Sequence, residues 1–335
     1  MKILLVNTKF LGDLIISSPG LKSVRKKFPD AEITLLVRKG YEDGVKNNPY
    51  INRIMAFDFG VKKDSFFSRL RDEINFIGSI VKERYDAVVS FHPGDRTAFL
   101  AWLSGAKIRI APRKQPFGFF FNVKVDVEED TISYLDYYNR IASALTGGPG
   151  ELKTEYFVSS EERACANEFF IENEIDSNGL IIGVHPGASE PTKIWQEEKF
   201  AELIKNIAAI PESKIILIAG PKEASKAARI RSAVHGQNVS LFNSDDINKT
   251  AAVMERIRLL VSNDSAARHL AVALGIPVIA LMPADNQNCW NFYDNSASHH
   301  VLSGERIFPE EGQPYLGKIS PDEVFQKIKE VLKLK

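Results

Sequence analysis

The sequence has few cysteines, no excess of charge and no long hydrophobic run. Cys165 and Cys289 are the two cysteines among 335 residues, and neither belongs to a Cys-x-x-Cys motif. A disulfide framework is therefore excluded, and a zinc or redox site is disfavoured. No apolar run approaches the ~18 residues of a transmembrane helix. Lys9 and Asp13 interrupt the apolar N-terminal segment, which argues against a signal peptide. We therefore expect a cytoplasmic protein.

Basic and acidic residues are equal in number, with 43 of each. The absence of a basic excess disfavours a nucleic-acid-binding protein. The balance hides a difference between the two halves of the chain. Residues 1–150 hold 23 basic and 17 acidic residues, whereas residues 151–335 hold 20 basic and 26 acidic residues. Either the halves are domains with different partners, or the difference is chance scatter over solvated surfaces.

Apolar runs bounded by turn residues alternate with segments of helical periodicity. In the first half we predict strands at 2–7, 32–37, 51–57, 85–91 and 107–110 and helices at 14–27, 66–84, 97–104 and 134–145. In the second half we predict a helix opened by a capping box at Ser159 or Ser160, strands at 180–185, 214–220, 238–242, 258–262 and 277–282, and helices at 197–209, 222–234, 247–257, 266–274 and 321–332. This alternation indicates an α/β fold with mostly parallel sheets.

The Gly-Gly-Pro-Gly segment at 147–150 is the best candidate for a linker. We therefore predict two doubly wound α/β domains, residues 1–150 and 151–320, with a C-terminal helix in 321–335. Ligands of such sheets bind beyond the carboxyl ends of the strands, and two facing domains would form a cleft. The tripeptide His-Pro-Gly follows a strand twice, which hints at an internal repeat.

The loop after the first strand ends in Gly12-Asp13. Gly12 permits a tight turn or a close approach to a ligand. Asp13 stands near the start of a helix and is a candidate general base. The alternative is a carboxylate that only satisfies the free N–H groups of the helix start. No GxGxxG motif follows this strand, which disfavours a dinucleotide site.

The loop after the strand at 180–185 has features of an anion site. Its small residues Gly187, Ala188 and Ser189 leave backbone N–H groups free, and Lys193 can place a charge on a phosphate. The alternative is a solvated lysine beside a core tryptophan. In the next strand-to-helix loop, Glu223 is a candidate ribose ligand or an ordinary acid at a helix start.

The loop after the strand at 258–262 also opens a helix. Its Asp264-Ser265-Ala266-Ala267 segment offers small residues and a free helix start, on which a pyrophosphate can bind. His269 lies about one turn further on. It either faces the same site or is a buried core histidine.

The segment between Asp95 and Asp126 contains no acidic residue. Its six basic residues are Arg96, Lys107, Arg109, Arg113, Lys114 and Lys124, and its aromatic residues include Phe99, Trp102, Phe117, Phe119, Phe120 and Phe121. This mixture suits an anionic amphiphile or a membrane surface. It also suits single-stranded nucleic acid, or core aromatics with solvated charges.

Together the loops resemble those of glycosyltransferase family 9, the lipopolysaccharide heptosyltransferases, over roughly residues 1–302. The resemblance rests on KILLV at 2–6 with Leu11-Gly12-Asp13 and Pro19, FPDAEI at 28–33, NPYI at 48–51, Gly187-Ala188-Ser189 with TKIW at 192–195, NDS at 263–265 with His269, and ALGIPV at 273–278. The chain departs from the family pattern at Ala266-Ala267-Arg268 and at Met282-Pro283-Ala284. Both departures lie in donor loops and put the identity of the donor sugar in question.

The resemblance implies two Rossmann-like domains of the glycosyltransferase-B type. It also implies an inverting, metal-independent transfer of heptose from ADP-heptose to the inner core of lipopolysaccharide, without a cofactor. The first domain would bind the anionic glycolipid acceptor, with peripheral contact to the cytoplasmic face of the inner membrane. The second domain would bind the nucleotide-sugar donor, and domain closure would bring the two together. We expect no nucleic-acid partner.

By this resemblance Asp13 is the catalytic base, and Lys193 is a catalytic residue that binds phosphate. The expected donor-binding residues are Gly187, Ala188, Ser189, Lys193, Glu223, Asp264, Ser265, Ala266, Ala267 and His269. The expected acceptor-binding residues are Gly12, Arg96, Arg113 and Lys114. We expect no metal site, since His299-His300 lacks a carboxylate partner. The alternatives are a family member that uses a different nucleotide sugar and a two-domain binding protein without catalysis.

Overall fold

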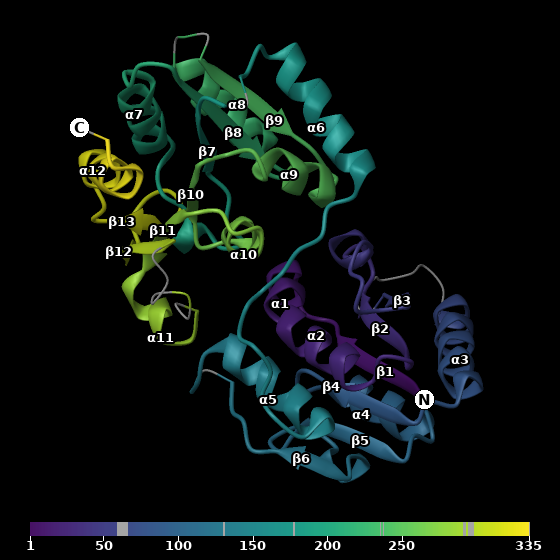
Figure 1. Cartoon of the computed structure of the whole chain (residues 1–335). Helices are drawn as coiled ribbons and strands as arrows, with labels where there is room; N and C mark the ends of the chain where they lie inside the picture. The colour runs from purple at the N-terminus through teal and green to yellow at the C-terminus, as the bar shows by residue number, and fades with distance from the viewer. Residues whose placement is uncertain are drawn as a thin grey trace. The chain divides into compact units, whose positions relative to one another are not determined.

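The computed structural model describes residues 1–58, 66–129, 131–176, 178–234, 236, 238–290, 293 and 298–334. It divides into two compact units, Met1–Glu155 and Tyr156–Lys335 (Figure 1). The division falls just after the predicted linker at 147–150. The C-terminal helix belongs to the second unit, because it packs on another helix of that unit.

The first unit is a doubly wound parallel sheet. Its strands are β1 (Lys2–Asn7), β2 (Glu32–Arg38), β3 (Arg53–Phe57), β4 (Ala87–Ser90), β5 (Ile108–Pro112) and β6 (Val123–Val125), and its helices are α1 (Leu11–Ile16), α2 (Ser18–Lys27), α3 (Phe66–Glu83), α4 (Asp95–Leu103) and α5 (Tyr134–Thr146). The strand order is β3-β2-β1-β4-β5-β6, and every pair is parallel. This is the order of a Rossmann sheet.

The apolar runs of the first sheet follow from burial on both faces. In β1 all residues from Ile3 to Val6 are buried. Leu4 and Val6 pack in a core with residues of α3 and α4, and α5 covers the other face together with α2. A strand buried on both faces needs a continuous apolar run rather than an alternating one, which is why these strands are readable from the sequence.

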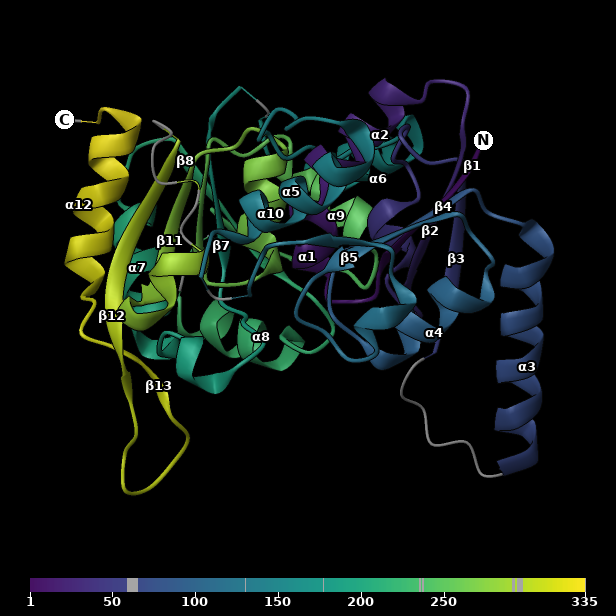
Figure 2. The same ribbon diagram turned by 90° about the horizontal axis from the view of Figure 1, so that it is seen from below.

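The second unit repeats the same winding and adds an antiparallel edge. Its strands are β7 (Leu180–His185), β8 (Ser213–Ala219), β9 (Val239–Asn243), β10 (Leu259–Asn263), β11 (Val278–Pro283), β12 (His299–Ile307) and β13 (Tyr315–Gly317), and its helices are α6 (Ser160–Glu172), α7 (Glu197–Ala208), α8 (Ala224–Ala233), α9 (Ile247–Met254), α10 (Ala266–Ala273), α11 (Gln287–Trp290) and α12 (Pro321–Leu332). The order is β13-β12-β11-β10-β7-β8-β9, and Figure 2 shows β12 continuing into the hairpin with β13.

The candidate sites of the two units lie at equivalent strands of their sheets. β7 corresponds to β1 and β10 to β4, so the strand order reverses between β1 and β4 and again between β7 and β10. Ligands of such sheets bind at the carboxyl ends of these central strands. The His-Pro-Gly tripeptides follow β4 and β7, which are not equivalent strands. The tripeptide therefore does not mark an internal repeat.

Some element predictions were wrong in detail. The predicted helix at 14–27 is two helices, because the chain turns at Ser17 and Pro19 stands in the first turn of α2. α1 also starts earlier than predicted and includes Gly12 and Asp13. The strands β6, β12 and β13 were not predicted. Within the described part of the chain, none of the helices combines the length and hydropathy needed to cross a bilayer.

Candidate active site

Asp13 is a buried carboxylate at the carboxyl edge of the first sheet. The chain leaves β1 at Asn7, and Asp13 is the third residue of α1, with 6% of its surface exposed. One carboxylate oxygen accepts a hydrogen bond from the Tyr138 hydroxyl at 2.6 Å. The other accepts from the backbone N–H of Phe10 at 3.2 Å. Asp13 thus fills the helix-capping role that was its alternative interpretation, and its carboxylate is also held in one orientation.

The environment of Asp13 favours a base stronger than an ordinary aspartate. Burial raises the pKa of Asp13 above its usual value, and the hydrogen bond from Tyr138 and the charge of Lys9 offset only part of the rise. Burial and the neighbouring carboxylate also hold the pKa of Tyr138 well above 10, so this phenol stays a donor. A carboxylate with a raised pKa, fixed by two donors, is suited to accept a proton from a hydroxyl.

His92 follows β4 at the same edge of the first sheet. It is buried, and its Nε2 lies 3.0 Å from Thr8 Oγ1, in the loop after β1. Burial lowers the pKa of His92 to about 4, so the ring is neutral at pH 7. The sequence interpretation did not assign His92 to the site. The strand-end His-Pro-Gly tripeptide was the available signal.

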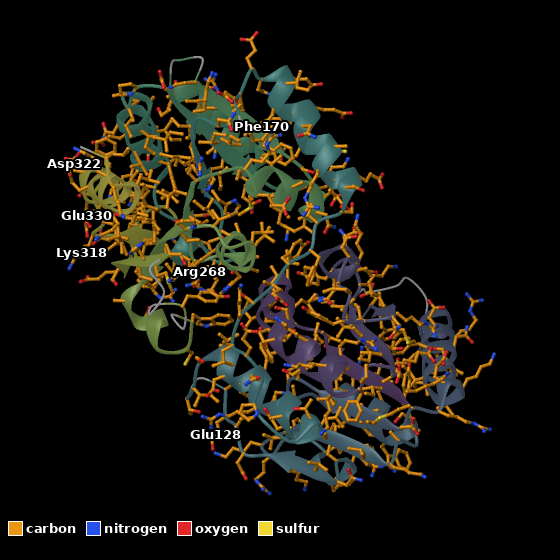
Figure 3. The ribbon with its side chains drawn as sticks, in the orientation of Figure 1. Glu128, Phe170, Arg268, Lys318, Asp322 and Glu330 are labelled. Carbon is orange, nitrogen blue, oxygen red and sulfur yellow. The ribbon has the colours of Figure 1, made fainter. Side chains whose placement is uncertain are left out.

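In the second unit, Lys193, Asp264 and Arg268 form one ionic cluster. Lys193 Nζ lies 3.2 Å from one oxygen of Asp264, and Arg268 lies 2.9 Å from the other. Arg268 projects from α10 (Figure 3) and is fully buried. The Lys193 side chain is only 13% exposed, so it is not the solvated lysine of the alternative interpretation.

The two neighbouring cations keep the Asp264 carboxylate of this cluster ionised. Burial alone would raise the pKa of Asp264, but the charges of Arg268 and Lys193 outweigh burial and hold this pKa below its usual value. The cluster therefore contains two cations and the buried carboxylate of Asp264 next to the start of α10, and the exposed Glu190 lies 3.7 Å from Lys193 at its border. The cations and the helix start all favour an anion at this edge of the sheet.

His269 contacts the buried side chain of Arg268. Its Nε2 lies 3.2 Å from the Arg268 guanidinium and its Nδ1 lies 3.3 Å from the Tyr293 hydroxyl. Arginine only donates, so Nε2 accepts and Nδ1 carries the proton. Burial, followed by the charge of Arg268, holds the pKa of His269 well below its usual value. The ring is thus a neutral, partnered group, as in the core-histidine alternative, and it contacts the ionic cluster rather than standing free beside it.

A buried asparagine fixes the loop that carries Lys193. Asn263, the last residue of β10, donates to the backbone oxygens of Pro186 and Gly187 at 3.0 and 3.4 Å. Its side-chain oxygen accepts from the backbone N–H of Trp195 at 3.2 Å. One side chain therefore holds both ends of the loop. The sequence interpretation did not assign this role to Asn263.

Gly187 and Glu223 lie against each other. A Cβ atom on Gly187 would stand 2.6 Å from Glu223 Cγ and 2.8 Å from His185 Nε2. The Glu223 side chain, at the residue before α8, also lies 3.0 Å from the Cβ position of Gly220. Glycine is required at 187 because the glutamate folds back over the loop after β7. This packing brings the predicted ribose ligand to the loop that holds Lys193.

The remaining predicted residues lie on the expected loops. Ser265 is the residue before α10, and its hydroxyl lies 3.1 Å from that of Ser262. Of the predicted acceptor residues, Arg113 forms an ion pair with Asp126, and Lys114 Nζ lies 2.6 Å from Glu128, the glutamate that Figure 3 labels after β6. Gly12 lies within α1 and Arg96 in the first turn of α4. Ala188 and Ser189 lie in the loop after β7, and Ala266 and Ala267 are the first two residues of α10.

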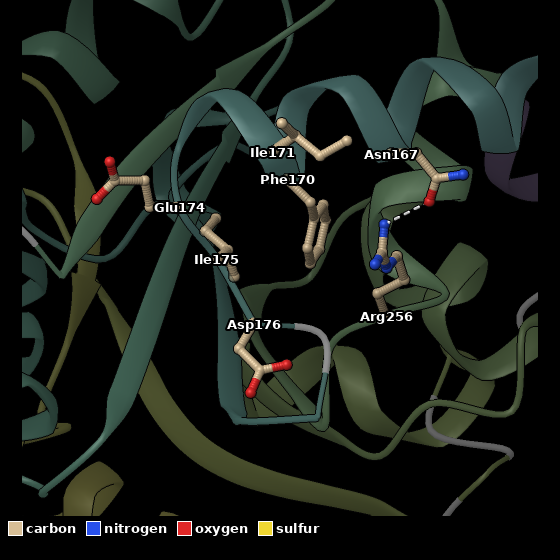
Figure 4. Close-up of a pocket in the computed structure, with 7 residues that line it drawn as sticks. All are labelled: Asn167, Phe170, Ile171, Glu174, Ile175, Asp176 and Arg256. Carbon is tan, nitrogen blue, oxygen red and sulfur yellow. Dashed lines mark hydrogen bonds between the residues drawn. The ribbon is translucent and has the colours of Figure 1, made fainter.

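A pocket of about 440 Å³ lies at the end of the second sheet opposite the ionic cluster, where strands β7 and β10 begin (Figure 4). Its lining comes from the end of α6 and from the segments that lead into β7 and β10. Arg256 lies over the ring of Phe170 at 3.9 Å and donates to Asn167 at 2.8 Å. These contacts occupy the arginine within the wall of the pocket. Among the described residues, no group of three or more His, Cys, Asp or Glu side chains is placed to hold a metal ion.

Comparisons with known proteins identify the family of the chain. The model of glycosyltransferase family 9 (heptosyltransferase) matches residues 74–313. Lipopolysaccharide heptosyltransferase 1 of Campylobacter coli is 25% identical over 325 residues, which cover 92% of this chain and 91% of that protein.

Two solved structures share the fold. The glycosyl transferase family 9 protein of Veillonella parvula aligns with a TM-score of 0.83 and 21% identity over 100% of this chain and 97% of the other. The Escherichia coli heptosyltransferase WaaC with ADP aligns with a TM-score of 0.73 and 20% identity over 100% and 99%. The predicted fold of two Rossmann-like α/β units, the glycosyltransferase-B type, is thereby confirmed. With the family match over most of its length, the chain belongs to glycosyltransferase family 9.

Proposed function

We propose that the protein transfers a heptose from ADP-heptose to the inner core of lipopolysaccharide. The observation that carries this proposal is the cluster of Lys193, Asp264 and Arg268 at the start of α10. Lys193, Arg268 and the start of α10 together place positive groups where a diphosphate would bind, beside the carboxylates of Asp264 and Glu190. Within family 9, relatives are named as lipopolysaccharide heptosyltransferases, and one solved relative holds ADP.

The donor site in this proposal lies in the second unit. Lys193 and the N–H groups of Ala266 and Ala267 hold the diphosphate, and Glu223 accepts hydrogen bonds from the ribose hydroxyls. As the bond between the anomeric carbon and the diphosphate breaks, negative charge grows on the leaving ADP. Lys193 and the helix start stabilise that charge, and they do so in the place a metal ion would take in a metal-dependent enzyme. Gly187, Ala188 and Ser189 provide close backbone contact.

The base in this proposal is Asp13 in the first unit. The acceptor hydroxyl attacks the anomeric carbon from the face opposite the diphosphate, and its proton passes to the Asp13 carboxylate. One new C–O bond forms, one C–O bond to ADP breaks, and the configuration at the anomeric carbon inverts. Gly12 allows the acceptor to approach this carboxylate, and the surface with Arg96, Arg113 and Lys114 receives an anionic glycolipid at the membrane surface, which requires Arg113 and Lys114 to exchange Asp126 and Glu128 for the acceptor.

A second candidate is transfer from a different nucleotide sugar. Arg268 supports it, because this buried arginine stands where the family pattern has another residue and contacts both Asp264 and His269. An extra cation behind the donor loop changes the charge that the sugar or diphosphate meets.

A transfer assay tests the proposal. Purified protein is incubated with ADP-heptose, and in parallel with UDP-, GDP- and CDP-sugars, on lipopolysaccharide that ends before the first heptose. We expect ADP release that requires the acceptor, one added heptose by mass, the inverted anomer by NMR, and full activity in EDTA. Acceptor-dependent release of another nucleotide would favour the second candidate. Binding of ADP without acceptor-dependent release would favour a non-catalytic binding protein.

A further inference from the structure

Five aromatic side chains form a cluster on the first unit, here termed the aromatic ridge, in which four rings are exposed and the ring of Phe120 is half-buried against the core. Phe99 and Trp102 come from α4, and Phe117, Phe119 and Phe120 come from the short helix η2 (Gly118–Phe120) and the residue before it. Neighbouring ring centroids lie 4.4 to 6.1 Å apart. Trp102 is 51% and Phe119 72% exposed. The ridge is thus a contiguous apolar surface open to solvent.

The local structure holds these rings outward. Phe99 and Trp102 are three residues apart and therefore share one face of α4. The Arg109 guanidinium donates to the Phe120 backbone oxygen at 2.6 Å and also to Ala106, which ties η2 to the turn after α4. Phe117 adopts a left-handed backbone, with φ of +51°, which is costly for a phenylalanine.

The charges beside the ridge are positive and partly unpaired. Lys107 and Lys124 are exposed, and neither pairs with a carboxylate within the described part of the chain. The partners of Arg109 are backbone oxygens, which leave its charge uncancelled. In contrast, Arg113 and Lys114, which the sequence interpretation assigned to the acceptor, pair with Asp126 and Glu128. The unpaired charges therefore belong to Lys107, Arg109 and Lys124, which lie in the same segment without acidic residues.

We propose that the aromatic ridge docks on the anionic surface of a lipid bilayer. Aromatic rings with lysines at their border match the boundary between acyl chains and anionic headgroups. The rings pack against one another, whereas a site for single-stranded nucleic acid needs separate ring faces on which bases stack. The inference rests on the proposed function only in that a glycolipid acceptor lies in a membrane. The exposure and charge of the ridge are independent of the donor site.

Vesicle binding tests the inference. The full chain is mixed with phosphatidylcholine vesicles with and without phosphatidylglycerol, and binding is measured by flotation. We expect binding that requires phosphatidylglycerol and weakens with salt. The double variant Trp102→Ala/Phe119→Ala should bind about tenfold more weakly or worse, since each lost ring removes a large buried area. The double variant Lys107→Gln/Lys124→Gln should also lose binding.

Two controls separate the ridge from general surface effects. Phe308 is 70% exposed in the second unit, so Phe308→Ala removes an exposed ring elsewhere and should bind vesicles normally. A lipid-borne quencher should reduce the emission of Trp102, whereas Trp195 is fully buried and Trp290 is a half-buried residue of the second unit, so that both should be insensitive. Quenching should therefore fall sharply in Trp102→Phe.

Three results would overturn the inference. The first is the same vesicle binding in the ridge variant and in Phe308→Ala. The second is no binding of the intact chain to anionic vesicles. The third is a dimer in solution that dissociates in the ridge variant, because the ridge would then be covered by a second copy. ADP binding is measured on every variant. Retained ADP binding with no vesicle binding would reject the ridge inference and leave the proposed function standing.

Discussion

Single side chains at the carboxyl ends of the strands carry the proposed chemistry, and Asp13 is one of them. Its carboxylate is buried, caps α1 and accepts from Tyr138. Asp13→Asn retains the size of the side chain and removes its basicity. We predict a loss of turnover of about 10²- to 10⁴-fold with donor affinity unchanged, because general base catalysis contributes in this range. Steady-state rates and ADP titration check this. Normal turnover in the folded variant would remove Asp13 as the base.

The pH dependence of the rate should report Asp13. A base works in its ionised form, so kcat/KM should rise with pH through a pKa above that of an ordinary aspartate. The Tyr138 hydrogen bond lowers the Asp13 pKa, so Tyr138→Phe should move this limb of the profile to higher pH. Tyr137 is a neighbouring buried tyrosine whose hydroxyl has no partner among the described residues. The matched variant Tyr137→Phe should leave the limb in place, and equal shifts in both variants would contradict the assignment.

Arg268 should matter for stability as well as for the donor site. It is the fully buried partner of the buried Asp264. Arg268→Met leaves that carboxylate with less compensating charge, and we predict a loss of about 3–5 kcal/mol in the free energy of unfolding. Arg229 forms an exposed pair with Glu197, so Arg229→Met should cost at most about 1 kcal/mol.

Urea denaturation measures both variants of this pair. The double variant Asp264→Asn/Arg268→Met should recover part of the lost stability, because it removes the uncompensated carboxylate while Lys193 loses Asp264 and keeps only Glu190 among the described residues. Equal costs for Arg268→Met and Arg229→Met would show that the buried pair is not important for stability.

The sequence interpretation found residues that stand in strand-end loops, and it could not find their partners. Asp13 and Lys193 follow β1 and β7 in a recognisable pattern. Tyr138 stands 125 residues from Asp13, and Asn263 contacts a loop 76 and 77 residues away. Such pairs exist only once the sheet is wound, and no local period or spacing encodes them.

At the scale of elements, burial on both faces made the central strands predictable. β1, β7 and α12 have the predicted bounds, since each is an apolar or amphipathic run between clear end signals. β6 has only three residues, and β12 mixes His299 and His300 with charged residues further on. These segments lie at or beside a sheet edge, where a continuous apolar run is not required.

The side chain of Asn263 holds both ends of the loop after β7. Asn263 makes three hydrogen bonds to the ends of this loop. Asn263→Ala should therefore loosen the loop that carries Lys193. We predict faster hydrogen exchange at the Trp195 amide, which loses its acceptor, and ADP affinity weaker by about tenfold, with a loss of unfolding free energy of about 1–3 kcal/mol. This role of Asn263 would be rejected if hydrogen exchange at the Trp195 amide and ADP affinity were both the same in the variant as in the unchanged protein.

At the scale of the whole molecule, two units with the same order of central strands carry different chemistry. The central strands of the first sheet present a buried carboxylate, whereas those of the second present cations and a helix start. The charge difference between the halves, visible in composition, has the opposite sign to these local site charges. In our proposal the basic first unit meets the anionic acceptor, and the second unit binds the donor through a local cluster of cations despite its acidic total.

The central claim is that the second unit holds the diphosphate of an ADP-sugar through Lys193. Calorimetric titration of the full chain with ADP, UDP, GDP and CDP tests it most directly, repeated with Lys193→Ala and with Lys214→Ala. Lys214 lies in β8 of the same sheet, at the opposite end of the strand from the donor loops. We predict selective ADP binding that weakens at least about tenfold in Lys193→Ala and is unchanged in Lys214→Ala. No binding of any nucleotide, or equal ADP affinity in both variants, would contradict the account.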